Sequence, residues 1–156
     1  MEIKTIGVVG SGLMGRGIAH VTALSGYNVI LQDISEDALK NALKNIETEL
    51  DKGIVRGKTT QEDKERTLGN IITTTSLEVF RQVDYVIEAV PEVLEIKQAT
   101  FAELDSICRP DVIFASNTTS QSITEIASAT ERTDRFIGMH FFNPVHKMKL
   151  IEMVNG

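Results

Sequence analysis

Short runs of apolar residues alternate along this chain with segments whose apolar positions repeat at helical spacing. The runs are rich in β-branched residues and predict buried parallel strands at residues 3–9, 28–31, 71–73, 83–90, 112–115 and 135–142. The segments between them predict helices, the clearest at residues 13–25, after Ser35, at 94–108 and at 123–127. A last apolar run, at residues 150–154, has no helix before it. This alternation predicts an α/β fold with a doubly wound, mostly parallel sheet and helices on both of its faces.

The ends of two helices can be read from capping residues. Ser35 is the expected N-cap of the second helix, and Glu36 and Asp37 follow it, where the helix dipole favours negative charge. Residues 60–63, of sequence TQED, predict the start of a further short helix.

Composition narrows the class of protein. The 156 residues predict a single domain over residues 1–156, and 16 basic against 22 acidic residues give a net charge of −6. This acidic balance argues against a nucleic-acid partner. The single cysteine, Cys108, excludes an intrachain disulfide and a cysteine-based zinc site, and no metal is expected. No apolar run is long enough to span a bilayer and no signal-peptide pattern is present, so we expect a cytoplasmic protein without a membrane partner.

A glycine-rich turn follows the first predicted strand and opens the first helix. It consists of Gly10, Ser11, Gly12, Leu13, Met14 and Gly15. In this context the first glycine permits a tight turn, the second lets the backbone approach a pyrophosphate, and the third lets helix and strand pack closely. The free N–H groups of the helix N-terminus favour phosphate binding. The turn therefore predicts a Rossmann-type site for a dinucleotide.

Asp33 ends the second predicted strand, 18 residues after the last glycine of the turn. This spacing is typical of a carboxylate that accepts hydrogen bonds from the adenosine ribose, and its charge would repel a 2′-phosphate. The predicted cofactor is therefore NAD rather than NADP. A helix-capping role for Asp33, just ahead of Ser35, is the alternative.

Polar residues gather where other predicted strands end, which is where ligands bind in doubly wound sheets. The stretches concerned are residues 88–92, 116–120 and 140–143. Neutral His140 could accept a proton from a substrate hydroxyl, and Glu152 could orient its imidazole ring. The alternative for His140 is a strand-end histidine with a satisfied hydrogen bond. We expect His20 to be structural and His146 to be exposed.

The whole chain resembles the N-terminal NAD-binding domain of the 3-hydroxyacyl-CoA dehydrogenases, including the bacterial 3-hydroxybutyryl-CoA dehydrogenases. The resemblance is carried by GSGLMGRGIA at residues 10–19, VIEAV at 86–90, ASNT at 115–118, MHFFNPV at 139–145 and MKLIE at 148–152. The two last segments are more specific than the glycine turn. The resemblance implies NAD-dependent interconversion of a short-chain (3S)-3-hydroxyacyl-CoA and a 3-ketoacyl-CoA, in fatty-acid or butyrate metabolism.

The resemblance also implies roles for individual residues. His140 matches the family's general base and Glu152 its orienting carboxylate, while the substrate-contacting serine is replaced here by Thr119. A threonine keeps the hydroxyl but is stiffer at χ1. The residues implied to contact the cofactor, besides those of the turn and Asp33, are Glu92, Lys97, Asn117 and Asn143.

For the CoA moiety, the resemblance points to the end of the second helix. Lys52 and Arg56, with Lys58 close by, could meet the phosphates of the substrate, or could equally be solvated surface charges. His146 and Lys147 stand where relatives more often have small or apolar residues.

Relatives continue into a helical C-terminal domain that forms a homodimer and encloses the acyl chain, and residue 156 lies where that domain would start. We therefore expect this chain to be part of a longer enzyme or a natural stand-alone module. Two other functions stay open: a non-catalytic module that senses NAD, which would not need the pair of His140 and Glu152, and another β-hydroxyacid dehydrogenase.

Overall fold

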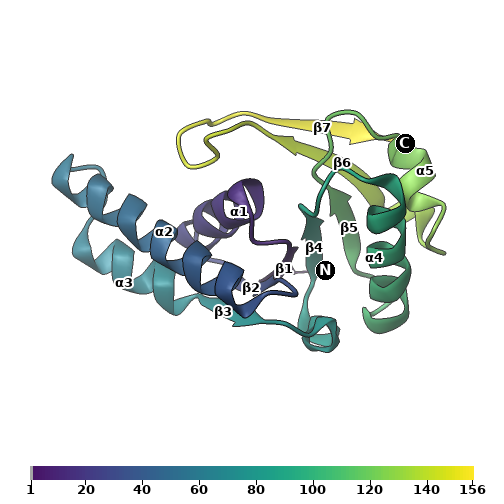
Figure 1. Ribbon diagram of the computed structural model, residues 1–156, viewed down its shortest axis with the longest axis horizontal. Helices are drawn as coiled ribbons and strands as arrows, with labels where there is room; N and C mark the ends of the chain where they lie inside the picture. Colours follow the sequence, from purple (N-terminus) through teal and green to yellow (C-terminus); the bar gives the residue numbers. More distant parts are fainter. Residues whose placement is uncertain (1) are drawn as a thin grey trace.

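A seven-stranded sheet forms the centre of the computed structural model, which describes residues 2–156 (Figure 1). The strands lie side by side in the order β3 (Ile71–Thr74), β2 (Asn28–Gln32), β1 (Thr5–Val9), β4 (Tyr85–Glu88), β5 (Ile113–Ser116), β6 (Phe136–Phe141) and β7 (Ile151–Asn155). All neighbours from β3 to β6 pair in parallel, and β7 pairs with β6 in the antiparallel sense. The predicted doubly wound, mostly parallel sheet is confirmed.

Five α-helices and two short 3₁₀ helices connect the strands. They are α1 (Leu13–Leu24), α2 (Glu36–Val55), α3 (Gln61–Gly69), η1 (Leu77–Gln82), α4 (Leu94–Ile107), α5 (Ile123–Ala127) and η2 (Thr133–Arg135). The expected caps are present: the Ser35 hydroxyl accepts from the Ala38 N–H at 3.1 Å, and Thr60 and Asp63 form a capping box. No helix among residues 2–156 is long and apolar enough to cross a membrane.

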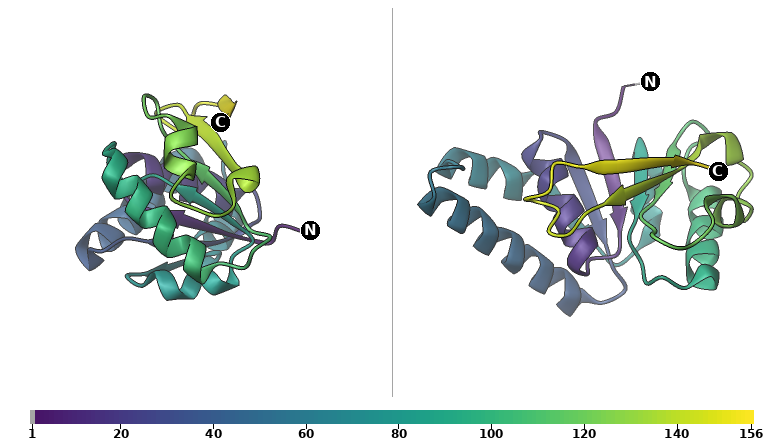
Figure 2. Two further views of the ribbon diagram at one scale, coloured as in Figure 1. Left: turned by 90° about the vertical axis from the view of Figure 1, so that its right-hand side faces the viewer. Right: turned by 90° about the horizontal axis from the view of Figure 1, so that it is seen from above.

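The two faces of the sheet are buried by different helices because successive side chains of a strand point to opposite sides. Val8 packs with α1 and α2, whereas Val9 packs with η1, α4 and α5. The same alternation separates Ile87 from Val86 in β4. Two views at right angles show the helices distributed over the sheet in this way (Figure 2). The near-continuous apolar runs of the sequence are therefore strands buried on both faces.

Some predicted boundaries differ from the structure. The run at 83–90 contains a strand of only four residues, β4, because residues 77–82 form a 3₁₀ turn before it and Glu88 ends the ladder. The last apolar run forms β7, whose five residues are all exposed, so its apolar side chains are not part of the core of residues 2–156. Because no helix precedes it, β7 returns directly beside β6, and its connection reaches over α1 (Figures 1 and 2).

The turn between β1 and α1 lies against the end of β4 and has no space for a side chain at its first and third glycines. Gly10 has a φ of +96°, which L side chains rarely adopt, and a Cβ there would lie 2.6 Å from the Ala89 carbonyl oxygen. A Cβ on Gly15 would overlap the Gly10 carbonyl oxygen. In contrast, a Cβ on Gly12 would meet no atom within 4 Å. The first and third glycines are thus required by packing, and the second leaves space above the turn.

We expect Gly15→Ala to lower the free energy of unfolding by about 3 kcal/mol or more, because backbone rather than a movable side chain occupies the space. The matched substitution Gly12→Ala should cost less than about 1 kcal/mol. Urea unfolding followed by circular dichroism measures both, and equal losses would contradict this account of the turn.

Candidate active site

The chain changes direction within the sheet between β1 and β4, which is where doubly wound folds bind their ligands. The connections that follow β1 and β4 leave this point toward opposite edges of the sheet. A cleft of about 650 Å³ opens there. Most of the residues predicted to contact the cofactor line it: Gly10, Ser11, Gly12, Leu13, Met14, Asp33, Glu92 and Asn117.

The start of α1 forms the floor of this cleft. Gly12, the N-cap, supplies no side chain that bonds the first N–H groups, and the first turn holds no acidic residue. These N–H groups and the positive end of the helix dipole are therefore free to interact with an anion. Together with the space above Gly12, this arrangement fits the pyrophosphate of a dinucleotide. Gly15 lies beneath the turn and does not line the cleft.

Asp33 lines the cleft and also holds the turn together. Its Oδ2 accepts hydrogen bonds from the N–H and the hydroxyl of Ser11, at 2.9 and 2.8 Å, and its Oδ1 accepts from the Ser35 N–H at 3.0 Å. Partial burial opposes ionisation, but these hydrogen bonds outweigh it and hold the pKa of Asp33 below its usual value. The two roles considered for Asp33, accepting hydrogen bonds from the adenosine ribose and capping the start of α2, are thus compatible. Ser11 is buried and supports Asp33 from beneath.

Glu92 lines the cleft after β4, on the other side of β1 from Asp33, and its ion-pair partner Lys97 is fully buried. The Lys97 ammonium is 3.0 Å from Glu92 Oε1 and 2.6 Å from Glu88 Oε2. Glu92 also accepts hydrogen bonds from the hydroxyls of Thr118 and Ser120, at 2.8 and 3.3 Å. Partial burial opposes ionisation of Glu92, yet the contacts with Lys97 and Thr118 hold its pKa below the usual value. Lys97, expected to contact the cofactor, is buried and holds the carboxylate that lines the cleft.

Asn117 connects the cofactor cleft to the strand that carries His140. Its N–H donates to the Glu88 carbonyl oxygen at 2.8 Å, and its side-chain oxygen accepts from the Phe141 N–H at 3.0 Å. The same residue lines the cleft. Its place at the end of β5 therefore fixes the end of β6 relative to the cofactor site.

His140 and Glu152 are directly opposite each other on β6 and β7. Opposite residues of an antiparallel pair share one face of the sheet, and the two line a small cavity of about 130 Å³ with Thr118 and Thr119. The His140 ring also contacts Phe142, with ring centroids 4.5 Å apart. Within residues 2–156, no hydrogen bond joins the side chains of His140 and Glu152. The three residues predicted to be catalytic are therefore brought to one cavity.

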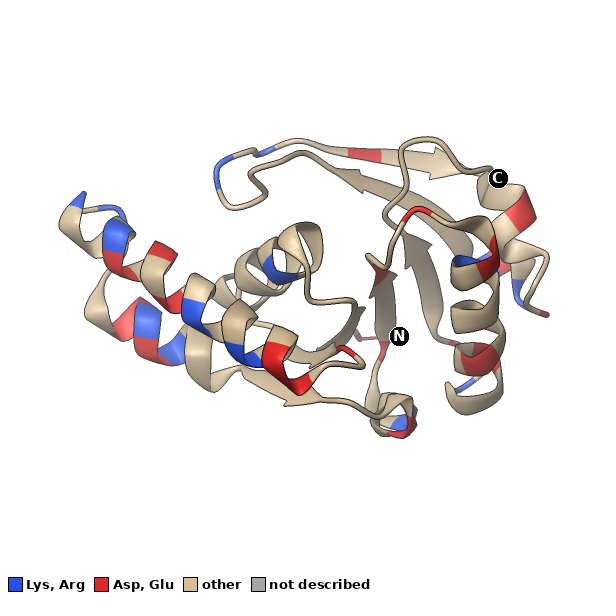
Figure 3. Ribbon diagram, in the orientation of Figure 1, with Lys and Arg blue, Asp and Glu red and all other residues tan. Residues whose placement is uncertain are grey.

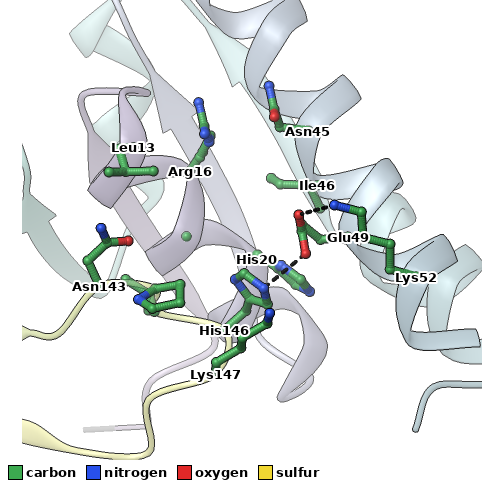
Figure 4. A pocket seen from close by; sticks show the side chains of 13 residues that line it. Leu13, Arg16, His20, Asn45, Ile46, Glu49, Lys52, Asn143, His146 and Lys147 are labelled. Atoms are coloured by element: carbon green, nitrogen blue, oxygen red, sulfur yellow. Dashed lines mark hydrogen bonds and ion pairs between the residues drawn. The ribbon is translucent and has the colours of Figure 1, made fainter. Parts of the chain in front are cut away.

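A second cavity, of about 290 Å³, lies between α1, α2 and the connection from β6 to β7 (Figure 4). Its charged and polar side chains are Arg16, His20, Asn45, Glu49, Lys52, Asn143, His146 and Lys147. Leu13 lines both this cavity and the cofactor cleft, so the two adjoin. Asn143, expected to contact the cofactor, lies in this second cavity.

His146 was expected to be exposed, and this was wrong. Its ring stacks on that of His20, with centroids 5.5 Å apart, and its Nε2 is 3.0 Å from Glu49 Oε2. The side chain is 23% exposed. The reason is the fold of the β6–β7 connection, which lies on α1 and brings His146 between two helices. His20 is buried in α1, as expected, and burial and the neighbouring His146 lower its pKa to about 4.

Lys52 lies on the rim of this second cavity, where it pairs with Glu49 at 3.3 Å, while Arg56 lies beyond it at the exposed end of α2. Figure 3 shows basic residues along α2 and α3 and in the β6–β7 connection. The feature that the sequence analysis missed is the buried pair of Glu88 and Lys97. An acidic residue directly after the apolar pair Val86 and Ile87 was its local signal.

Known proteins are similar to this chain over almost its whole length. Residues 5–156 match the family described as 3-hydroxyacyl-CoA dehydrogenase, NAD binding domain. The chain is 45% identical over 156 residues to a 3-hydroxyadipyl-CoA dehydrogenase of Escherichia coli (strain K12), of which it covers 33%. It is 44% identical over 154 residues to a 3-hydroxybutyryl-CoA dehydrogenase of Bradyrhizobium diazoefficiens, of which it covers 53%.

A solved structure shows the same relation. The (S)-3-hydroxybutyryl-CoA dehydrogenase of Ralstonia eutropha superposes with a TM-score of 0.97 and 44% identity, over 99% of this chain and 55% of that one. The chain thus spans between a third and about half of the length of these relatives.

We expect the chain to bind NADH at least about tenfold more tightly than NADPH, because the Asp33 carboxylate would repel a 2′-phosphate. Asp33→Asn should remove most of this difference, whereas Asp37→Asn, an equal change of charge on the exposed first turn of α2, should preserve it. Calorimetric titration with each nucleotide measures the ratio. Equal affinities in the natural chain would contradict the role of Asp33.

The pKa of His20 predicts a loss of stability in acid. An unfolded histidine titrates near 6.5 and folded His20 at about 4, so the unfolded chain binds more protons between these values. This group should therefore lower the free energy of unfolding by about 2 kcal/mol between pH 7 and pH 5. His20→Gln should remove that part of the pH dependence in urea unfolding at the two pH values. The same pH dependence in His20→Gln and in the natural chain would show that the pKa of His20 is not lowered by folding.

Proposed function

This chain belongs to the family of 3-hydroxyacyl-CoA dehydrogenase NAD-binding domains, and from that premise we propose that it is the cofactor-binding half of an enzyme that interconverts (3S)-3-hydroxyacyl-CoA and 3-ketoacyl-CoA. The observation that carries the proposal is the placement of His140 opposite Glu152, at the same edge of the sheet as the glycine turn. A module that only sensed NAD would not need this pair.

The cofactor is NAD, which supplies the acceptor for the hydride of the substrate alcohol when it is bound. The start of α1 would hold its pyrophosphate, and Asp33 would accept hydrogen bonds from its adenosine ribose. The remaining half of the molecule would then extend toward Glu92 and Asn117, which line the other end of the cleft.

His140 is proposed as the general base. Its imidazole would take the proton of the substrate hydroxyl in oxidation and return it in ketone reduction. Glu152, across the strand pair, would orient the ring and stabilise its charged form. Glu152 is exposed and His140 is half-buried. Directly opposite residues have Cβ atoms about 5 Å apart, so a side-chain rotation would bring the carboxylate to the ring.

Thr119 is proposed to hydrogen-bond the substrate oxygen through its hydroxyl. It is exposed and lines the cavity that holds His140 and Glu152. This places a donor and a base around the same space, which is the arrangement that proton transfer to and from a carbonyl oxygen requires.

The CoA phosphates are proposed to occupy the cavity between α2 and the β6–β7 connection. Arg16, Lys52 and Lys147 line it and outnumber the single carboxylate, Glu49. This cavity adjoins the cofactor cleft, so an extended thioester could reach from here to His140. Arg56 would contribute only to attraction at long range, because it lies beyond the cavity at the end of α2.

Several properties belong to the whole enzyme and are proposed on the same premise. They are a preference for short acyl chains such as 3-hydroxybutyryl, a homodimer formed through a further helical domain, a location in the cytoplasm, and the folding of residues 1–156 as one domain. Two of the relatives described above are named after the CoA thioesters 3-hydroxyadipyl-CoA and 3-hydroxybutyryl-CoA.

The decisive experiment replaces His140 by Gln in an enzyme that carries the complete length of its relatives. Turnover of acetoacetyl-CoA should fall by at least about 10³-fold, because the base is lost, while the dissociation constant for NADH stays within about threefold. Steady-state kinetics and calorimetry measure the two effects.

Two further results would change the proposal. Retained turnover in His140→Gln would remove His140 from the mechanism. Equal activity of the natural enzyme on acetoacetate and on acetoacetyl-CoA would show that CoA is not recognised, and would favour another β-hydroxyacid dehydrogenase.

A further inference from the structure

We propose that Glu88, which has no contact with the cofactor cleft, sets the relative affinity of the cleft for oxidised and reduced cofactor. It does so by keeping the cluster of Glu88, Lys97 and Glu92 at a net negative charge beside the nicotinamide end. The inference rests on the cofactor orientation given under Proposed function.

Glu88 is a fully buried carboxylate surrounded by hydrogen-bond donors. Its Oε2 accepts from the Lys97 ammonium at 2.6 Å and from the Val90 N–H at 2.8 Å, and its Oε1 accepts from the Ser116 hydroxyl at 2.6 Å. Burial raises the pKa of Glu88, and these three donors act against that rise by binding its charged form. We take Glu88 as ionised, because the Lys97 ammonium and two further donors hydrogen-bond both of its oxygens.

Lys97 is shared between two carboxylates. Its ammonium pairs with Glu88 and with Glu92, and its two other contacts, at 3.4 and 3.5 Å, are the carbonyl oxygens of Val90 and Asn117. Across residues 2–156, no other Lys or Arg pairs with Glu88 or Glu92. The cluster therefore holds two negative charges and one positive charge, and one negative charge is left over.

The excess charge is directed to the cleft. Glu88 and Lys97 are completely buried, whereas the Glu92 side chain is 38% exposed and lines the cleft beside Asn117. One ammonium cannot neutralise two carboxylates. The negative charge of Glu92 is therefore less compensated than it would be if Lys97 paired with Glu92 alone. Without the charge of Glu88, Lys97 would neutralise Glu92.

The nature of the cofactor makes this charge matter. The nicotinamide ring is positively charged when oxidised and neutral when reduced, while the rest of the molecule is the same. Asp33 and the glycine turn account for the adenosine end and the pyrophosphate, so the ring lies toward Glu92. A net negative charge there attracts the oxidised ring and has little effect on the reduced one.

The buried pair could also act on stability alone, and the test separates the two effects by comparing both cofactors. Glu88→Gln keeps the shape of the side chain and takes the cluster from −1 to zero. We expect the ratio of the dissociation constants of NAD⁺ and NADH to rise by about threefold to tenfold, because one unit of charge close to the ring is lost. Calorimetry with NAD⁺ and NADH on the natural chain and the variants measures this ratio.

Two control variants isolate the charge. Glu88→Gln combined with Lys97→Met leaves only Glu92 charged, so the net charge returns to −1 and the ratio should return to within about twofold of the natural one. Glu95→Gln removes one negative charge from the exposed first turn of α4, outside the cluster, and should not change the ratio.

Equal losses of affinity for NAD⁺ and NADH in Glu88→Gln would show a purely structural role and overturn the inference. A natural chain that binds neither nucleotide would overturn the proposed cofactor site and the inference together. If Glu88→Gln does not fold, two other proteins are compared: the Glu88→Gln/Lys97→Met variant, and the same variant with Glu92→Gln added. The added substitution takes the net charge of the cluster from −1 to zero. An identical ratio in those two proteins would likewise overturn the inference.

Discussion

The contact between the β1–α1 turn and the end of β4 is the constraint on which the site depends. Backbone meets backbone there, with Gly10 against the Ala89 carbonyl oxygen and Gly15 against Gly10 itself. Because no side chain separates them, the start of α1 lies directly beside the ends of β1 and β4. The cleft exists at this point because the chain leaves β1 and β4 toward opposite sides of the sheet. A side chain on Gly10 or Gly15 would push the start of α1 away from these strand ends, and with it the helix dipole that a pyrophosphate needs.

The charged residues of the cleft are held in place by donors from neighbouring strand ends. Asp33 is fixed by Ser11 and Ser35, and Glu92 by Lys97 and Thr118. Each carboxylate is thereby kept ionised and oriented before any ligand arrives, so binding does not have to pay for ordering it. Asp33 follows β2 and Glu92 follows β4, and the neutral glycine turn, which follows β1, lies between them. This distribution matches a ligand whose charged phosphates lie in its middle.

The sequence predicted the parts of this arrangement that follow from local pattern and strand order. The glycine turn, Asp33 and the polar strand ends could be identified because parallel strands deliver their carboxyl ends to one edge of the sheet. The placement of Lys97 could not be predicted, since a lysine at a helical position reads as exposed until the packing of α4 on β4 is known. His146 was misassigned for a similar reason. Its partners, His20 and Glu49, come from two other helices and share no sequence pattern with it.

The antiparallel pair of β6 and β7 joins the cofactor site to His140 and Glu152, the proposed catalytic pair. Asn117 ties the end of β5 to the Phe141 N–H, next to His140, so His140 is positioned from the wall of the cofactor cleft. On the other side, the connection from β6 to β7 is anchored to α1 through Val145 and to α2 through His146. The loop end of the hairpin is therefore held by Asn117 and α1, which also line the cleft, and by α2. A parallel seventh strand would need a helical crossover, and it would place the residue opposite His140 at a different register. The short return to β7 is thus what sets Glu152 across from His140.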